Sequence, residues 1–216
     1  VLALAEGGVL SVIVRNAFDG VVPDSRLNYT VAYLTAAPEF ANLTSFLWAA
    51  FSHGRAKVRF MSVLQVATIV LVATIALAPR TPNGLVLLAL AYTLARVFIT
   101  GLVTLRATVW RANYPRRDRV WITGRLQTVT VIVSSMTGFV LGAAMDWSPE
   151  AFRVLIPFMC ILGVGGAVLF AQVRVRGHAR LVRSERDGHH AHKPSLNPLT
   201  LLKVLFEDRR YGVFQV

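Results

Sequence analysis

Cysteine and charge are both scarce in this sequence. Cys160 is the only cysteine among 216 residues, so the chain cannot be a small secreted domain held together by disulfides. Charged residues make up 16% of the chain and hydrophobic residues 55%, with a mean hydropathy of +0.55. This balance excludes a disordered basic tail and does not fit a cytosolic enzyme.

The sequence also lacks the short motifs of known catalytic and metal sites. It contains no G-x-S-x-G, H-E-x-x-H, C-x-x-C or P-loop pattern. His189, His190 and His192 form a histidine tract without cysteine or carboxylate at fixed helical spacing, which is more typical of solvated chain than of a metal site. We therefore expect no enzyme activity, no metal and no bound cofactor.

Long apolar runs are what the sequence does contain. Residues 60–79, 126–145 and 154–173 are each twenty residues long without Asp, Glu, Lys or Arg, and about 20 apolar helical residues cross the hydrocarbon layer of a bilayer. We predict an all-α membrane protein with six spans, at residues 1–22, 29–52, 59–79, 85–110, 121–145 and 151–173.

A basic, polar segment follows the sixth predicted span. Residues 174–198 contain six Lys or Arg and no apolar run, which is typical of a solvated linker. An apolar element begins again at 199–216, the expected start of a second, truncated transmembrane half. The chain also lacks an initiating Met, so we expect it to be a fragment whose C-terminal half is missing.

The Lys and Arg residues responsible for the net charge of +12 are concentrated in alternate loops. The segments after the second, fourth and sixth spans carry three, five and six Lys or Arg, whereas the other loops carry only Arg26 and Arg80. The positive-inside rule then places the basic loops and the N-terminus in the cytoplasm of a multi-pass protein of the cell (inner) membrane. The basic clusters are short and lack a known nucleic-acid-binding motif, so no nucleic-acid partner is expected.

Ionisable side chains inside the spans are the best candidates for function, because a charge in hydrocarbon is costly unless it faces a cavity or a partner. Glu6 lies in the first span, and five others are candidates for solute binding or coupling: Arg15, Asp19, Glu39, Arg96 and Arg106.

Glu39 and Arg96 are expected at the same depth, ~15–17 Å from the outer surface. One hypothesis is that Arg96 neutralises Glu39 in the empty protein and then turns to an anionic solute, which frees Glu39 to exchange a proton. The alternative is a static ion pair that only joins two helices. Both interpretations stay open at the level of the sequence.

Six spans, a basic linker and a new apolar start resemble the N-terminal half of a major facilitator superfamily transporter. The stretch Gly54-Arg55-Ala56-Lys57-Val58-Arg59 resembles the end of the glycine and basic loop between the second and third helices of that family, and Arg96 to Gly101 is similar to the Arg and Gly pair of its fourth helix. The resemblance implies two inverted three-helix repeats whose first helices, the first and fourth spans, line a central cavity. It also implies that Gly54, Arg55, Lys57 and Arg59 take part in cytoplasmic gating.

The sequence departs from this family at two places. Phe51 stands where the loop of the family usually has an aspartate that braces it, and Gly142 is followed by Ala143 in place of the proline of the antiporter-type motif. The usual gating contact and antiport are therefore not supported. Gly138 and Gly142, and the glycines at 163, 165 and 166, are expected to let helices pack closely.

The sequence thus predicts a secondary active transporter that moves a small solute through the lipid bilayer by alternating access. The solute is anionic if the arginines of the fourth span bind it, although an arginine there can equally neutralise a carboxylate. The alternatives are an integral membrane enzyme acting on lipid and a non-transporting membrane scaffold.

Overall fold

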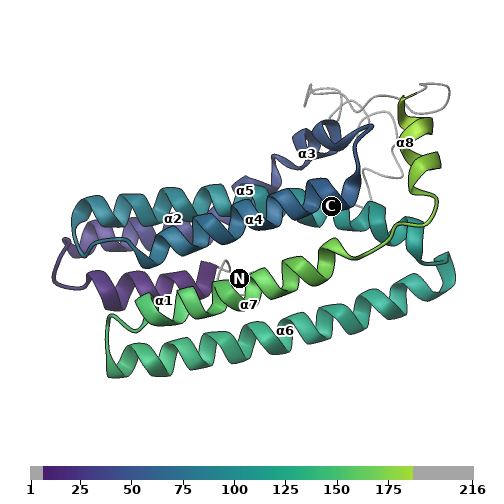
Figure 1. Ribbon diagram of the computed structural model, residues 1–216. Helices are drawn as coiled ribbons and strands as arrows, with labels where there is room; N and C mark the ends of the chain where they lie inside the picture. Colours follow the sequence, from purple (N-terminus) through teal and green to yellow (C-terminus); the bar gives the residue numbers. More distant parts are fainter. Residues whose placement is uncertain (1–6, 187–216) are drawn as a thin grey trace, which may run out of the picture.

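The computed structural model describes residues 7–186, and these form eight α-helices and no strand (Figure 1). The all-α prediction is confirmed for this part of the chain; Glu6 and the expected restart at 199–216 lie outside it. In chain order the helices are α1 (Gly7–Phe18), α2 (Asp24–Asn42), α3 (Ser45–Ser52), α4 (Lys57–Ala76), α5 (Pro82–Asn113), α6 (Arg116–Trp147), α7 (Phe152–Ala171) and α8 (His178–Arg186).

Four of these helices, α4 to α7, are long and apolar enough to cross a membrane. They correspond to the third to sixth predicted spans, with ends that differ from the predicted ones by a few residues. Large apolar side chains also cover the outside of the bundle: Val63 is 66%, Phe139 79% and Ile161 69% exposed. Such an apolar exterior is compatible with a protein surrounded by lipid.

The predicted second span, residues 29–52, is not one helix. It is divided between α2 and α3 at Leu43 and Thr44, where both N–H groups bond three residues back rather than four, to the carbonyls of Phe40 and Ala41. The Thr44 hydroxyl also donates to the Ala41 carbonyl (2.7 Å). These contacts tighten the last turn of α2 and end it.

Helix α5 is the centre of the packing. Leu88, Tyr92 and Ala95 on this helix are fully buried, and α4, α2 and α3 lie along it. The main apolar core also includes Phe18 of α1 and Phe152 of α7. A second apolar cluster joins α3, α4 and α5 near the end of the bundle where α8 lies.

Helix α6 packs differently from the others. Its buried residues, Thr137, Leu141 and Met145, all lie in its last third. The first twenty residues of α6 therefore contribute no buried side chain, and this helix forms one side of the bundle with little against it (Figure 1).

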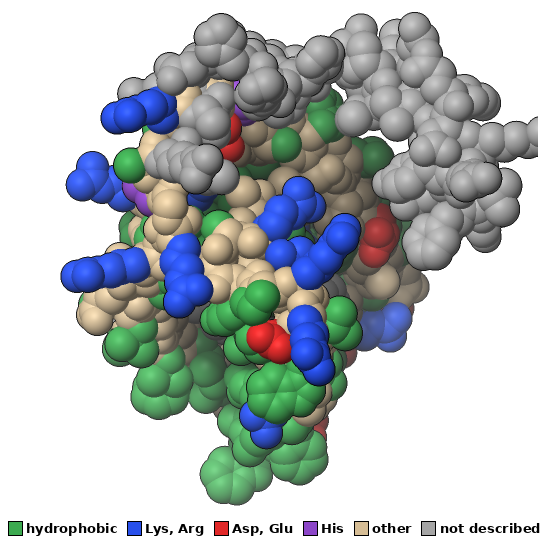
Figure 2. All heavy atoms as spheres, turned by 90° about the vertical axis from the view of Figure 1, so that its right-hand side faces the viewer, with side chains coloured by type: hydrophobic (Ala, Val, Ile, Leu, Met, Phe, Trp, Pro, Cys, Tyr) green, Lys and Arg blue, Asp and Glu red, His purple; other side chains and the backbone are tan. Residues whose placement is uncertain are grey.

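The predicted linker is partly helical. Helix α8 occupies residues 178–186 of the expected solvated segment 174–198 and lies beside α3 at one end of the bundle (Figure 1). Lys and Arg side chains gather on this end, with few acidic ones among them (Figure 2). The remaining linker, 187–198, lies outside the described residues.

Candidate functional site

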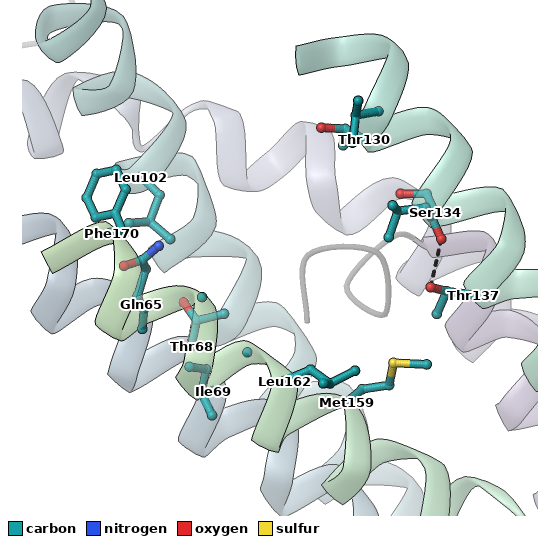
Figure 3. A pocket seen from close by; sticks show the side chains of 15 residues that line it. Gln65, Thr68, Ile69, Leu102, Thr130, Ser134, Thr137, Met159, Leu162 and Phe170 are labelled. Carbon is teal, nitrogen blue, oxygen red and sulfur yellow. Dashed lines mark hydrogen bonds between the residues drawn. The ribbon is translucent and has the colours of Figure 1, made fainter. Parts of the chain in front are cut away.

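A cavity of about 460 Å³ lies between α4, α5, α6 and α7 (Figure 3). Gln65 is near the middle of α4 and Ser134 near the middle of α6, so the cavity lies about half-way along the bundle. Its polar side chains come from two opposite walls and the remainder of its lining is apolar or glycine. The lining residues are Gln65, Thr68, Ile69, Leu102, Val129, Thr130, Val133, Ser134, Thr137, Met159, Leu162, Gly163, Gly166, Ala167 and Phe170.

The polar groups of this cavity are mainly hydrogen-bond acceptors. The hydroxyls of Thr68, Thr130 and Thr137 each donate to a carbonyl four residues earlier on their own helix, at 2.7–2.8 Å, and so keep lone pairs for a ligand. The Oε1 atom of Gln65 is buried and has no hydrogen-bond partner among the described residues. A ligand that donates O–H or N–H groups would satisfy these acceptors.

No charged side chain is among the residues that line this cavity. The predicted coupling residues therefore lie elsewhere, and an uncharged cavity such as this one is not indicated by the charged residues of the sequence. The repeated hydroxyl residues of α6, at 130, 134 and 137, have the spacing of one helical face. That spacing is the signal by which the α6 wall could have been found.

Most of the glycines of α6 and α7 that were expected to bring helices close together do not lie at a close helix contact. A Cβ atom added to Gly142, Gly165 or Gly166 would meet no atom within 4 Å, so the expectation of close helix packing is wrong at these three positions. At Gly138 the nearest atom would be Cγ2 of Val9, at an ordinary 3.6 Å. Gly166 lines the cavity, and its missing side chain leaves room there.

Arg15 and Asp19 lie at the end of α1. The Arg15 guanidinium donates to the side-chain oxygen of Asn28 on α2 (3.3 Å), and both Arg15 and Asp19 are exposed. Arg106 is half-buried on α5, with its guanidinium carbon 4.7 Å from the centroid of the Trp110 ring. Arg15 and Asp19 are one helical turn apart, whereas Arg106 lies on a different helix and shares no hydrogen bond or ion pair with them, so the three residues do not form one cluster.

Glu39 and Arg96 belong to adjacent helices, α2 and α5. The Glu39 carboxylate accepts a long hydrogen bond from the Asn42 amide (3.5 Å). The Asn42 oxygen lies 3.4 Å from the hydroxyl of Thr100, which is also 3.1 Å from the carbonyl oxygen of Arg96. Asn42 thus connects the turn of Glu39 to the turn of Arg96, while the ion pair between the two charges stays a prediction.

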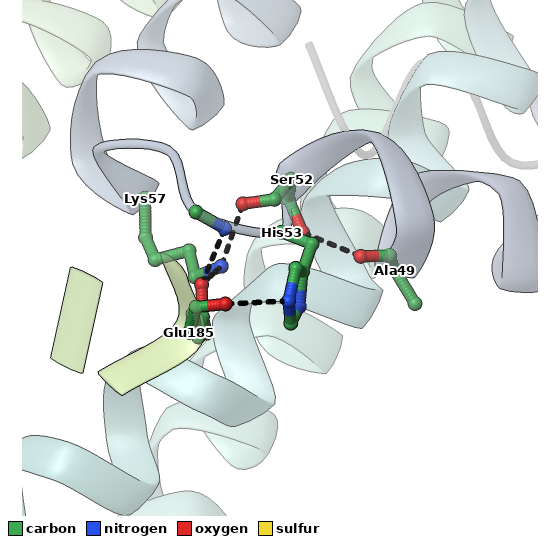
Figure 4. A network of polar contacts seen from close by, with 6 residues as sticks. Ala49, Ser52, His53, Lys57 and Glu185 are labelled. Carbon is green, nitrogen blue, oxygen red and sulfur yellow. Dashed lines mark hydrogen bonds and ion pairs between the residues drawn. The ribbon is translucent and has the colours of Figure 1, made fainter. Parts of the chain in front are cut away.

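The basic loop between α3 and α4 is held by an acid from α8 (Figure 4). Lys57, only 3% exposed, donates to the Ser52 carbonyl (2.6 Å) and forms an ion pair with Glu185 (2.8 Å). The same carboxylate accepts from the Gly54 N–H (2.6 Å), and the Glu185 carbonyl oxygen lies 3.0 Å from Nε2 of His53. Gly54 has φ +67°, a conformation that favours glycine.

Glu185 is thus the acid in contact with this basic loop. This acid comes from a different element, 128 residues after Lys57 in the chain. Of the other two basic loop candidates, Arg55 lies with its guanidinium carbon 5.8 Å from the centroid of the Phe60 ring, and Arg59 is exposed and lines a second cavity.

In comparisons with known proteins, no family model, curated protein or solved structure matches the chain. Within residues 7–186, no three His, Cys, Asp or Glu side chains gather as a metal site would require. The candidate site therefore rests on the geometry of the mid-bundle cavity and of the Lys57–Glu185 contact.

Proposed function

We propose that the chain is the six-helix half of a secondary transporter, similar to those of the major facilitator superfamily, which moves a small solute across the membrane by alternating access. The observation that carries this proposal is a largely apolar cavity with polar side chains on two opposite walls, half-way along helices of membrane-spanning length. Buried acceptors at that depth are costly unless water or a solute meets them. A scaffold would have no need of such a cavity.

The finer architecture belongs to the same proposal. The segments from α1 to α4 and from α5 to α7 would form two inverted three-helix repeats, with α2 and α3 together completing one span. The basic end of the bundle would face the cytoplasm, and a second half of the protein would complete the transport path. The separation of basic and other loops along the sequence supports this orientation.

The lining of the cavity favours an uncharged solute that carries hydroxyl or amino hydrogens. Gln65 and the threonines accept hydrogen bonds, and the apolar remainder would contact the carbon skeleton. An anionic solute bound by Arg96, with proton exchange at Glu39, is the alternative that the span charges suggest. It would use the face of α5 that lies against α2 rather than this cavity.

Uptake by liposomes containing the full-length protein tests the proposal. A panel of radiolabelled polyols, amides and organic anions is compared with empty liposomes. For the solute that enters, Gln65→Leu should raise KM about three- to tenfold, because one hydrogen bond is lost, and Gly166→Leu should abolish uptake by filling the cavity. Phe139→Leu, on the exposed side of α6, is the matched control.

The two solute classes give different outcomes in this experiment. Uptake of an anion that is insensitive to Gln65→Leu and lost in Arg96→Gln would support the α2–α5 site instead. Uptake of every solute at the level of empty liposomes would contradict transport by this protein.

A further inference from the structure

A second cavity, of about 600 Å³, lies at the basic end of the bundle. It is open to the surface and is lined by the start of α4, the segment at the end of α7 and the first residue of α8. Three of its side chains are basic and none is acidic. The lining residues are Ala56, Val58, Arg59, Ala171, Val173, Arg174, Val175 and His178.

Hydrogen bonds from α5 fix the segment that forms one wall of this cavity. The Asn113 amide donates to the carbonyl of Arg174 (3.1 Å), and its oxygen accepts from the N–H of Arg176 (2.9 Å). Gly177, with φ +66°, then turns the chain into α8. The wall is therefore held in place by Asn113 and not left as free linker.

The other end of α8 is also anchored. The ion pair between Glu185 and Lys57 attaches α8 to the start of α4, close to Ala56, Val58 and Arg59 of the cavity. Because the Glu185 carboxylate is already engaged by the Lys57 ammonium and the Gly54 N–H, its charge is largely compensated by these partners. The cavity keeps an excess of positive charge.

The basic side chains of the cavity have the properties of an anion site. Arg59 and Arg174 are exposed, so their guanidinium groups can turn toward a ligand. Nδ1 of His178 is buried and has no hydrogen-bond partner among the described residues, and it can donate to an anion when it carries a hydrogen. His178 also begins α8, where the helix dipole adds partial positive charge.

We propose that this cavity binds a phosphate group, either the headgroup phosphate of an anionic membrane lipid or a soluble phosphate. Two guanidinium groups match the oxygen geometry of phosphate, and a basic pocket at the cytoplasmic border of membrane helices is suited to anionic headgroups. Arg59 then acts as an anion ligand rather than as a gating residue. The inference is independent of transport, since binding is measured without any solute.

Lipid binding is measured by native mass spectrometry of the chain released from nanodiscs of phosphatidylcholine with phosphatidylglycerol. The parent chain should retain one phosphatidylglycerol. The double variant Arg59→Gln/Arg174→Gln should bind it at least about tenfold more weakly, because hydrogen bonds to charged groups are lost. His178→Phe keeps the ring shape without its nitrogens and should also bind more weakly.

The matched control is Arg116→Gln/Arg117→Gln, which removes the same charge from exposed positions at the start of α6 outside the cavity. It should bind like the parent. Helix content from circular dichroism and the unfolding midpoint without ligand show whether each variant is folded, and His178→Phe tests the site without any loss of arginine.

A second arm identifies the source of the phosphate. Inorganic phosphate is titrated at constant ionic strength against chloride, and the rise in the unfolding midpoint is recorded. Phosphatidylglycerol binding without a response to inorganic phosphate supports a lipid headgroup, whereas a response that is lost in Arg59→Gln/Arg174→Gln supports soluble phosphate. The proposal would be overturned if Arg59→Gln/Arg174→Gln and Arg116→Gln/Arg117→Gln weakened phosphatidylglycerol or phosphate binding equally. It would also be overturned if Arg59→Gln/Arg174→Gln bound both ligands as the parent does.

Discussion

Lys57 is the charged residue on which the basic loop depends, because its ammonium is buried and its two acceptors are the Ser52 carbonyl and the Glu185 carboxylate. A buried charge that loses its counter-ion is strongly destabilising. The position of α8 against the loop should therefore depend on Glu185.

Removing this counter-ion is the first test. We expect Glu185→Ala to lower the free energy of unfolding by ~1–3 kcal/mol, since Lys57 keeps only one acceptor. Glu150→Ala is the control: its contacts with Arg80 (3.9 Å) and Arg153 (3.4 Å) are partly exposed, so its effect should be below about 1 kcal/mol. Equal shifts of the unfolding transition in denaturant would show that the Lys57–Glu185 pair contributes no more than a surface pair.

Residues that lie close together in the chain were easier to single out from the sequence than residues that meet only in the fold. The resemblance to a transporter loop drew attention to the stretch from Gly54 to Arg59, and Gly54 and Lys57 both contact one carboxylate. Their part in gating stays a prediction. Glu185 could not be assigned to this contact, because it lies 128 residues from Lys57 and no periodicity connects them. The uncharged acceptor Gln65 was also missed, since a single glutamine in an apolar run has no characteristic pattern.

At the scale of the helices, Gly101 determines how closely α3 approaches α5. A Cβ atom at this position would lie 2.8 Å from the Trp48 ring and 2.9 Å from the Leu64 side chain. Both neighbours belong to the apolar cluster that joins α3, α4 and α5, so they have little room to move.

Overpacking at this contact is the second test. Gly101→Ala should lower the free energy of unfolding by ~1–3 kcal/mol, as measured by the unfolding transition in denaturant. Gly142→Ala, which adds the same methyl group where nothing lies within 4 Å, should be neutral or raise stability by up to ~1 kcal/mol through helix propensity. If Gly101→Ala is as stable as Gly142→Ala, α3 does not pack on α5 as described.

Helices α4 to α7 were predictable because each is long enough to cross the hydrocarbon layer and contains an apolar run with few charges. The break between α2 and α3 could not be predicted, because the residues at the break, Leu43 and Thr44, are neither glycine nor proline. Helix α8 was not predicted either: it has no apolar run, and its position depends on the contacts of Glu185 with a distant loop. Such tertiary contacts are invisible to hydropathy.

At the scale of the whole molecule, the unequal distribution of Lys and Arg predicts one orientation in the membrane. Single cysteines in a Cys160→Ala background test it with an impermeant thiol reagent on intact cells. Exposed positions at the basic end should be protected and those at the opposite end labelled. The protected positions are Arg55, Arg117 and Arg183, and the labelled positions are Arg26, Asn83 and Ser148.

The reversed labelling pattern would contradict the orientation, and a mixed pattern would contradict the assignment of the spans. Lys57 is unsuitable as a reporter because it is buried. The six chosen positions are all exposed, so protection at any of them reports its side of the membrane rather than its burial in the protein.

The central claim is that the mid-bundle cavity opens to each side of the membrane in turn. Ser134→Cys in the Cys160→Ala background places one thiol in that cavity, and Phe139→Cys places one on the exposed side of the same helix. A small, water-soluble, impermeant thiol reagent is applied to right-side-out and to inside-out vesicles. We expect Ser134→Cys to react in both preparations and Phe139→Cys in neither; reaction of Ser134→Cys from one side only, or from neither, would contradict alternating access.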